Sequence, residues 1–425
     1  MSIQHHDLGP DSAPPDAVVV VGGGVVGLAT AVELARRGRT TVIVDRGEIA
    51  AGCGIGSAGH IVPSHVIPLA APGMVRRLRR ELGRRNRALS IAWTLSPSFW
   101  SWAVSFMRHC TVESVDSAVP ALDALGGLSA ELVRELGAGA DIQHLRDGLL
   151  DVYGSSKAFE HACDHADELR GHGVRVQTLD AAELRRLEPA ANDSIVGAIQ
   201  FPDDSSVHPA SLLHALHEQA KGAGVTFVPR TEVTGFRCDG DRVSAVSTTR
   251  GDVQARHVVV AAGAWSGTFA DALGERLPVV GARGLSLTTE RPSTGPRRTM
   301  LLGEQHVAVA PSRDELRLSG WFELGQWSTT ASPHRIDRIE SLARSRLDFD
   351  ATLSNRRTWA GLRPMTPDAV PIIGPSTRWH NVTIATGHGM TGLSMGLGTG
   401  RLVAQSVVGE PTDIDIGRFS TGRFA

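Results

Sequence analysis

The segment from Val18 to Asp45 constrains the fold more strongly than any other part of the chain. It reads VVVVGGGVVGLATAVELARRGRTTVIVD. The four valines predict a buried parallel strand, the amphipathic run up to Gly38 predicts a helix, and Thr40–Val44 predicts a second strand. A strand, a glycine-rich turn, a helix and a further strand in this order predict a doubly wound α/β domain of the Rossmann type.

Three glycines in this segment have the spacing G-x-G-x-x-G that dinucleotides require. Gly22 permits a tight turn, Gly24 lets a pyrophosphate approach bare backbone, and Gly27 lets helix and strand pack closely. Val25 and Val26 open the helix, whose N-terminus favours the negative phosphates. We therefore predict that these five residues bind the phosphates of a dinucleotide.

The second strand ends at Asp45, which is followed by Arg46. A carboxylate at this place accepts hydrogen bonds from both ribose hydroxyls of an adenosine and repels a 2′-phosphate. This disfavours NADP and leaves FAD and NAD as alternatives. We include both residues in the predicted cofactor site.

A long charge-free stretch, Ile49–Val75, favours FAD. It is rich in glycine, alanine and proline, which is typical of a loop that passes a large uncharged group at close range, and an isoalloxazine ring is such a group. Ser57, Ala58, Gly59 and His60 lie within it and are predicted to contact the flavin.

The composition limits the partners and the cellular compartment that can be expected. The 425 residues carry a net charge of −2, which gives no reason to expect nucleic acid as a partner. Residues 1–16 lack the apolar core of a signal peptide, and the four cysteines have no C-x-x-C spacing, so we expect a cytoplasmic protein with reduced thiols. One of them, Cys53, has covalent flavin attachment as its alternative role. We prefer dissociable FAD, with Cys53 a small buried side chain.

Strand and helix signals divide the chain into two interleaved domains. We expect a discontinuous FAD-binding domain at residues 16–75, 202–277 and 355–425. The remainder, residues 76–201 and 278–354, is expected to form a second, α+β domain that binds the substrate. Its segments PVVGARGLSLTTE, HVAVAPS and ELRLSGWFEL alternate as neighbouring antiparallel strands do.

A second charge-free stretch, Ala88–Met107, has 20 residues, but its serines and Pro97 make it a poor membrane span. We interpret it as a buried helix pair. The alternative is a peripheral contact with the inner face of a membrane, because seven arginines occupy residues 76–87 and five aromatic residues follow, Trp93, Phe99, Trp100, Trp102 and Phe106.

Motifs along nearly the whole chain resemble those of FAD-dependent D-amino-acid dehydrogenases, within the D-amino-acid oxidase and glycine oxidase family. The motifs are SAGHIVPS, FPDDSSVHPASLLHAL, TEVTGF, VVVAAGAWS, WAGLRPMTPDAVPIIG and TGHGMTGLSMGLGTG. The resemblance implies an enzyme that transfers a hydride from an amino acid to flavin N5 and releases an imino acid, which hydrolyses to a keto acid. It also extends the predicted cofactor site to Val233, Ala262, Gly263, Trp265, Gly361, Gly387, Gly389, Met390, Thr391 and Gly392.

Arg363 is the first candidate catalytic residue. It stands between apolar residues before a proline, and its planar fork suits bidentate capture of a carboxylate. By resemblance it holds the substrate α-carboxylate over the flavin. The alternative is a structural arginine paired with Asp368 or a backbone carbonyl. Leu285, His306 and Trp321 are predicted to line the substrate pocket.

The second candidate catalytic residue, His388, lies in a glycine-rich turn. Gly387, Gly389 and Gly392 formally repeat G-x-G-x-x-G, but only 33 residues follow, too few for a second dinucleotide site. We expect the following helix to direct its N-terminus at the flavin pyrimidine edge, with assistance from His388. Two histidine pairs, at 161/165 and 214/217, lack further ligands, so we expect no metal.

The substrate and the acceptor stay open. Leu285 stands in RGLSLT where dehydrogenase relatives often read RGYSLT, so hydroxyproline, proline or an N-methyl amino acid such as sarcosine is an alternative to a linear D-amino acid. A quinone or another carrier is the expected electron acceptor. An NAD(P)H-driven flavoprotein reductase and a non-catalytic flavin subunit are the rival functions. The sequence gives no oligomeric state.

Overall fold

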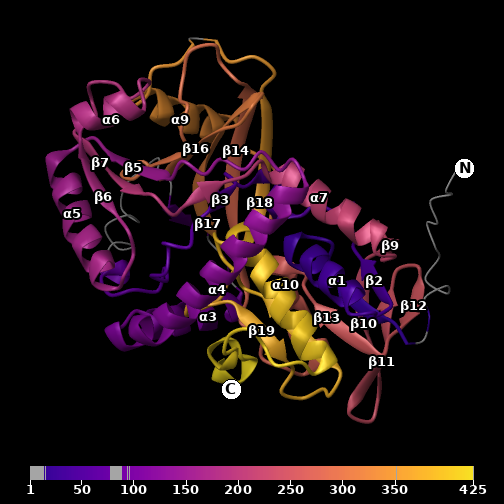
Figure 1. The fold of residues 1–425 in the computed structure, drawn as a ribbon. Coiled ribbons are helices and arrows are strands. Elements are labelled where there is room, and N and C mark those ends of the chain that lie inside the picture. The colour runs from indigo at the N-terminus through magenta and orange to yellow at the C-terminus, as the bar shows by residue number, and fades with distance from the viewer. Residues whose placement is uncertain are drawn as a thin grey trace, which may run out of the picture.

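The computed structural model describes residues 14, 16–76, 89–92, 94, 96–350 and 352–424. The described residues form two large sheets with helices around them, and two smaller sheets (Figure 1). One sheet has the strand order β19-β20-β13-β1-β2-β9, and all its pairings are parallel except that of β19 with β20. Its strands are β1 (Val18–Val21), β2 (Thr41–Val44), β9 (Thr226–Val228), β13 (His257–Val260), β19 (Ile372–Pro375) and β20 (Val382–Thr386).

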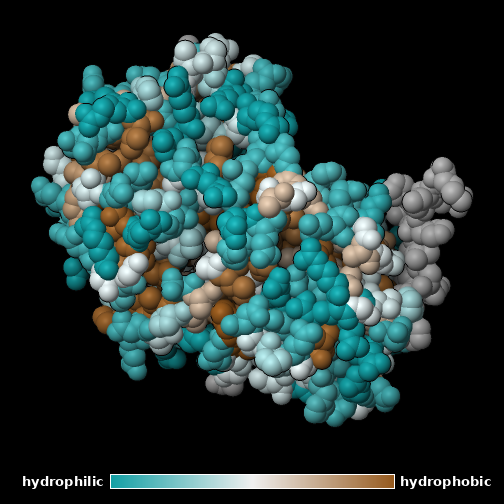
Figure 2. All heavy atoms as spheres, viewed as in Figure 1, coloured by the Kyte–Doolittle hydropathy of each residue, from teal (hydrophilic) through white to brown (hydrophobic). Residues whose placement is uncertain are grey.

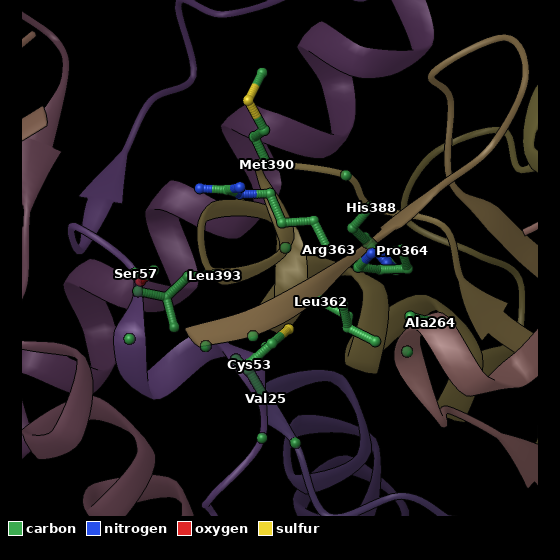
Figure 3. A pocket seen from close by; sticks show the side chains of 18 of the residues that line it. Val25, Cys53, Ser57, Ala264, Leu362, Arg363, Pro364, His388, Met390 and Leu393 are labelled. Carbon is green, nitrogen blue, oxygen red and sulfur yellow. The ribbon is translucent and has the colours of Figure 1, made fainter. Parts of the chain in front are cut away.

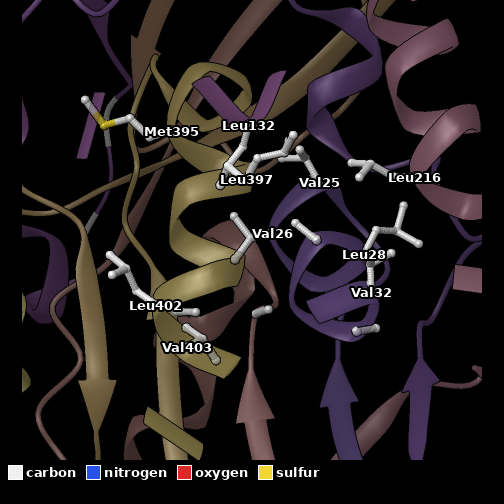
Figure 4. Close-up of a cluster of buried hydrophobic side chains, with 14 of the residues drawn as sticks. Val25, Val26, Leu28, Val32, Leu132, Leu216, Met395, Leu397, Leu402 and Val403 are labelled. Carbon is white, nitrogen blue, oxygen red and sulfur yellow. The ribbon is translucent and has the colours of Figure 1, made fainter. Parts of the chain in front are cut away.

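Helices from distant parts of the chain cover this sheet. They are α1 (Val25–Arg36), α4 (Val112–Gly139), α7 (Pro209–Gly222) and α10 (Gly392–Val408). Their apolar side chains meet in one buried cluster, in which Val25 and Leu28 of α1 lie near Leu397 of α10 and Leu216 of α7 (Figure 4). Gly400 lets α10 approach α1 closely, since a Cβ at this position would lie only 2.6 Å from Ala29. The predicted Rossmann-type unit is confirmed.

The larger sheet has the order β18-β14-β17-β16-β15-β5-β7-β6, and β4 pairs with β17. Its pairings are antiparallel apart from β15 with β5 and β17 with β4. The strands are β4 (Leu89–Ile91), β5 (Leu149–Tyr153), β6 (Gln177–Asp180), β7 (Gly197–Phe201), β14 (Val280–Glu290), β15 (Met300–Leu302), β16 (Val307–Pro311), β17 (Glu315–Leu324) and β18 (Arg357–Met365). This is the second, α+β layer that the alternating segments predict.

The remaining elements are short or peripheral. The strands β10 (Val233–Asp239), β11 (Arg242–Thr248) and β12 (Gly251–Gln254) form a small antiparallel sheet, and β3 (His60–Ile61) pairs with β8 (Ser205–Ser206). The further helices are α3 (Pro97–His109), α5 (Ser156–Gly171), α6 (Ala181–Leu187), α8 (Ala270–Leu273) and α9 (Pro333–Arg344).

Strand pairing bears on two of the expected domain segments. β18 falls in the segment 355–425 that we assigned to the cofactor domain, but it pairs with β14 in the larger sheet. The helix α4 falls in the segment 76–201 that we assigned to the substrate domain, but its Leu122 and Leu125 pack in the cluster around α1 and α10. The expected domain boundaries stay a prediction. Both β18 and α4 make their main contacts in the layer opposite to the one expected for them.

The charge-free stretch Ala88–Met107 contains α3. Phe99, Trp102 and Phe106 of this helix are buried, whereas Trp100 is 50% exposed. Residues 77–88 and Trp93 lie outside the described residues, so most of the arginine cluster cannot be placed against α3. Within the described part of the chain, no helix is both long and apolar enough to cross a membrane.

Candidate active site

One cavity of about 830 Å³ lies at the carboxyl ends of the parallel strands and reaches the larger sheet. This edge of a doubly wound sheet is where ligands bind. Except for Gly27 and Gly387, every predicted site residue lines this cavity. The sequence predictions from four separate segments therefore converge on one place, and ten of the lining residues are labelled in Figure 3.

The glycine turn after β1 has the geometry that a pyrophosphate needs. Gly22 has φ +111°, and a Cβ there would lie 2.5 Å from the carbonyl oxygen of Ala261. A Cβ on Gly27 would lie 1.8 Å from the Gly22 oxygen, so this glycine serves packing. Gly24 differs, because a Cβ there meets no protein atom within 4 Å, although the residue lines the cavity. The space beside Gly24 is a cradle open to a ligand.

Asp45 fixes the turn and faces the cavity. Its two carboxylate oxygens each accept one hydrogen bond of 2.7 Å, from the backbone N–H groups of Gly23 and Gly47. Each oxygen keeps a further lone pair, so the carboxylate can also accept ribose hydroxyls. The neighbouring Arg46 stacks on Trp265, with its Cζ 3.6 Å from the ring centroid. This arrangement fits the adenosine end of FAD.

The charge-free loop is held against the larger sheet by Arg317. Nη1 of this side chain donates to the carbonyl oxygens of Ile55 at 2.7 Å and Ser57 at 2.9 Å. The ring of Trp359 lies against the same loop, since a Cβ on Gly56 would be 2.2 Å from it. Sequence reasoning missed Arg317 and Trp359 as site residues. The motif WAGLRPM, which contains Trp359, could have identified this residue from the sequence. No sequence feature indicated Arg317.

Arg363 extends from β18 into the cavity (Figure 3). Its Nη1 donates to the carbonyl oxygen of Trp321 at 3.0 Å, and no carboxylate among the described residues forms an ion pair with it. Burial lowers the pKa of Arg363 to about 10, so the guanidinium stays charged at neutral pH. Asp368 instead pairs with Arg423 at 2.8 Å and Arg418 at 3.2 Å. The structure therefore has Arg363 bound to a backbone carbonyl, with most of its donors left for a ligand.

A β-bulge aims the Trp321 carbonyl at Arg363. Two residues of β17, Trp321 and Phe322, stand opposite the single Gly284 of β14. Trp321 has φ +70°, a strained conformation for a bulky residue, and such strain often occurs at ligand sites. A Cβ on Gly284 would lie 2.3 Å from Arg363 Nη1, so only glycine leaves room for the guanidinium.

Burial keeps three other groups in the cavity wall uncharged. It raises the pKa of the Cys53 thiol, which opposes formation of a nucleophilic thiolate. It lowers the pKa of His60 to about 3 and that of His388 to about 4. His388 Nε2 lies 2.8 Å from Thr399 Oγ1 in α10, and in Figure 3 its ring points away from the Arg363 guanidinium. These contacts suit a neutral histidine that positions the glycine turn.

The glycine turn before α10 is tied to β18. The Gly389 N–H donates to the carbonyl oxygen of Pro364 at 2.8 Å. No side chain caps the N-terminus of α10, and its first turn contains no acidic residue. Thr391 and Gly392 line the cavity at this end. The N-terminus of α10 therefore lies at the cavity, and the edge of the flavin that it would face stays a prediction.

Comparison with known proteins defines the class. The sequence model of the family described as FAD dependent oxidoreductase matches residues 17–406. The chain is 33% identical to a D-amino acid dehydrogenase of Paramagnetospirillum magneticum, with 96% of this chain and 98% of that protein covered. It is 31% identical to a D-amino acid dehydrogenase of Rhizorhabdus wittichii, with 96% and 100% covered. The chain therefore belongs to the FAD-dependent oxidoreductase family, and FAD is its cofactor.

Solved structures agree with this fold. The glycine oxidase of Geobacillus kaustophilus superposes with a TM-score of 0.70 at 25% identity, covering 95% of this chain and 97% of that one. The L-proline dehydrogenase of P. horikoshii superposes with a TM-score of 0.72 at 19% identity, covering 96% and 97%. The second likeness concerns the fold alone.

Proposed function

We propose that this flavoprotein oxidises the carbon–nitrogen bond of an amino acid, with a D-amino acid as the favoured substrate. FAD, when bound, supplies the acceptor for the hydride that leaves the α-carbon. The amine loses a proton, and the imino acid product reacts with water to give a keto acid and ammonia. The names of the two curated relatives support the D-amino acid.

The observation that carries this proposal is the buried charge of Arg363. A guanidinium without an ionic partner is costly inside a protein, and a substrate carboxylate would supply that partner through two parallel hydrogen bonds. The carbonyl of Trp321 holds the side chain in place, and Gly284 leaves the room for it. A carboxylate bound there is fixed in direction, which orients the α-carbon for transfer.

Positioning is the main task of the remaining residues. His60 and His388 are kept neutral by burial, so neither adds a second positive charge that would compete with Arg363 for the substrate carboxylate. The Trp359 ring and the loop held by Arg317 form one side of the cavity. The cofactor contacts predicted from the sequence are proposed for the same cavity.

The direct test is anaerobic mixing of the flavoprotein with single amino acids while the flavin absorbance is followed. Bleaching by D-amino acids is the expected result. Bleaching only by L-amino acids, by proline-type substrates or by N-methyl amino acids would move the proposal to those alternatives. Bleaching by NAD(P)H alone would favour a reductase, and bleaching by none of these compounds would favour a flavin-carrying subunit.

The role of Arg363 is tested by substitution. Arg363→Leu should keep the flavin spectrum and lose about 3–5 kcal/mol of transition-state stabilisation, because a buried charged pair loses one partner. Arg363→Lys should restore activity only in part, since an ammonium cannot form the fork. Wild-type turnover by the leucine variant would refute the carboxylate-binding role.

For the electron acceptor we propose a quinone or another carrier in place of oxygen. The exposed side chains Trp100, Val104 and Met107 lie at helical spacing on one side of α3, and Figure 2 shows apolar residues at the lower left, where Figure 1 places this helix. We propose that this stripe contacts the inner face of a membrane. Substrate-reduced enzyme should be reoxidised by a soluble quinone analogue faster than by air-saturated buffer. Rapid reoxidation by oxygen with stoichiometric peroxide would identify an oxidase.

A further inference from the structure

The cavity has a wall of apolar side chains beside Arg363 that the proposed reaction does not use. Two of these side chains come from the charge-free stretch Ile49–Val75, two from α3 and two from β17. All of them line the cavity, and they belong to one buried cluster or pack against it. We call the following six residues the apolar wall: Leu69, Met74, Trp102, Phe106, Phe322 and Leu324.

Strand register places this wall next to Arg363. Arg363 of β18 is paired with Ala282 of β14, and Ala282 is paired with Leu324 of β17. Residues paired in this way project their side chains from the same face of the sheet, so Arg363 and Leu324 share a face. Neighbouring strands lie roughly 5 Å apart, which separates these two backbones by about 10 Å. Phe322 lies closer, with its ring centroid 5.9 Å from Arg363 Cζ.

The helix α3 closes the wall with two rings. Trp102 Nε1 donates to the carbonyl oxygen of Met365 at 3.0 Å, and Met365 stands two residues after Arg363 on β18. The rings of Trp102 and Phe106 stack with their centroids 5.3 Å apart. Both rings are buried in the same cluster as Leu324. They are therefore fixed against the face of the sheet from which Arg363 projects.

The apolar wall offers no partner to a charged or polar group. Trp102 carries the only N–H among the six side chains, and Met365 already accepts it. The carboxylates among the described lining residues are those of Asp45, Glu48 and Glu232. They lie together at the adenosine end, because the N–H of Thr231, the residue before Glu232, donates to the Asp45 carbonyl oxygen at 2.8 Å. A polar group placed at the apolar wall would lose its hydrogen bonds to water without replacement.

We propose that the apolar wall is the subsite for the substrate side chain, so that amino acids with an aromatic or branched apolar side chain are preferred. This inference rests on the proposed function, because Arg363 must hold the carboxylate for the side chain to reach the wall. The α-carbon is bonded to that carboxylate, so the side chain begins beside the guanidinium and extends over Phe322 toward α3. Burial of its apolar surface there favours binding.

The first test compares D-phenylalanine, D-alanine and D-aspartate as substrates of the wild-type flavoprotein. D-Phenylalanine differs from D-alanine only by its phenyl ring, and its kcat/KM should be roughly 100-fold higher, because a single buried methylene is worth about tenfold or more in such a pocket. A ratio below tenfold would overturn the subsite. A higher kcat/KM for D-aspartate would also overturn it and assign the side chain to His65, a lining histidine whose Nδ1 lies 3.7 Å from Asp204.

These outcomes are separate from failure of the proposed function. In each of them a D-amino acid still bleaches the flavin, so the proposed function stays intact while the subsite is rejected. If none of the three compounds bleaches the flavin, the proposed function fails for D-amino acids and the subsite fails with it.

Variants then locate the effect on α3. Phe106→Ala leaves a void at the wall, so kcat/KM for D-tryptophan relative to D-phenylalanine should rise about tenfold as the larger indole fills it. Phe99→Ala is the matched control, because both rings are 5% exposed and belong to the same cluster, but Phe99 does not line the cavity. An unchanged ratio in Phe106→Ala, or an equal rise in both variants, would overturn the proposal. Should either variant fail to retain FAD, the wild-type ratios alone decide.

Discussion

The two ends of the cavity are built in different ways. At the end of β1, the turn is formed by residues that are neighbours in the sequence, and the missing side chain of Gly24 leaves an open cradle beside it. At the Arg363 end, residues distant in sequence meet at a bulge, where Trp321 has φ +70° and Gly284 gives room to the guanidinium. The first end follows a local pattern, and the second depends on how two strands are paired. A substitution should therefore affect cofactor binding at one end and catalysis at the other.

The largest effect is expected at the cradle. Gly24→Val should abolish FAD binding, because the side chain enters the space of the pyrophosphate while its Cβ meets no protein atom within 4 Å. Flavin absorbance and the thermal midpoint after purification measure this. Gly127→Val is the matched control, since a Cβ there also meets nothing within 4 Å but the residue lies on α4 outside the cavity. A yellow Gly24→Val protein would contradict the assignment.

A smaller effect, on catalysis alone, is expected at the bulge. Gly284→Ala should lower kcat/KM about 100-fold, equivalent to roughly 3 kcal/mol, because its Cβ displaces the guanidinium of Arg363. FAD should stay bound. Gly281→Ala on the same strand should be mild, since its Cβ would lie at an ordinary 3.4 Å from Leu362. Loss of flavin with retained turnover per bound FAD would show that the two ends are not separable.

The loop between the two ends should show a weaker effect than either end. Arg317→Met removes the two hydrogen bonds to Ile55 and Ser57, and we expect FAD to bind roughly 30-fold more weakly, or about 2 kcal/mol. Isothermal titration of the apoprotein with FAD measures it. Arg313→Met is the control, because that arginine forms an exposed pair with Asp141. Equal affinities of the two variants would show that the loop needs no anchor.

The smallest effect concerns the sheet beneath the cradle. Burial lowers the pKa of His257 in β13 to about 4. In the unfolded chain the His257 imidazole takes up a proton near pH 6.5, whereas in the folded chain it does so only near pH 4. The free energy of unfolding is therefore highest above pH 6.5 and falls as the pH drops toward 4. At pH 5.5 the loss is about 1.4 kcal/mol. Urea unfolding of His257→Asn should show a weaker decline than wild type between pH 7 and 5.5. An equal decline of the free energy of unfolding with pH in wild type and variant would contradict a buried, neutral His257.

The contrast also explains which features were predictable from the sequence. The predicted strand, turn, helix and strand match β1, α1 and β2 because each depends on neighbouring residues. Nearly all the site residues predicted from the sequence line the cavity, because their motifs resemble those of known flavoproteins. The FAD assignment is confirmed, whereas the individual site roles stay predictions.

The features that were missed depend on distant partners. Arg317 and Ile55 are 262 positions apart, and nothing near either residue indicates the bond. The bulge at Trp321 follows from a register shift between β14 and β17, which no single strand encodes.

The strand order has a consequence for synthesis. β1 lies between β2 and β13, and β13 in turn pairs with β20, so the sheet is complete only when Val382 has been made. At roughly 5–20 residues per second, the valines of β1 wait about 12–48 s for β13, and β20 is added to the sheet later still. During this time an apolar strand edge has no permanent neighbour and is open to pairing with other chains. A chain that ends before β20 lacks the strand that covers β13, so the sheet beneath the cradle stays unfinished.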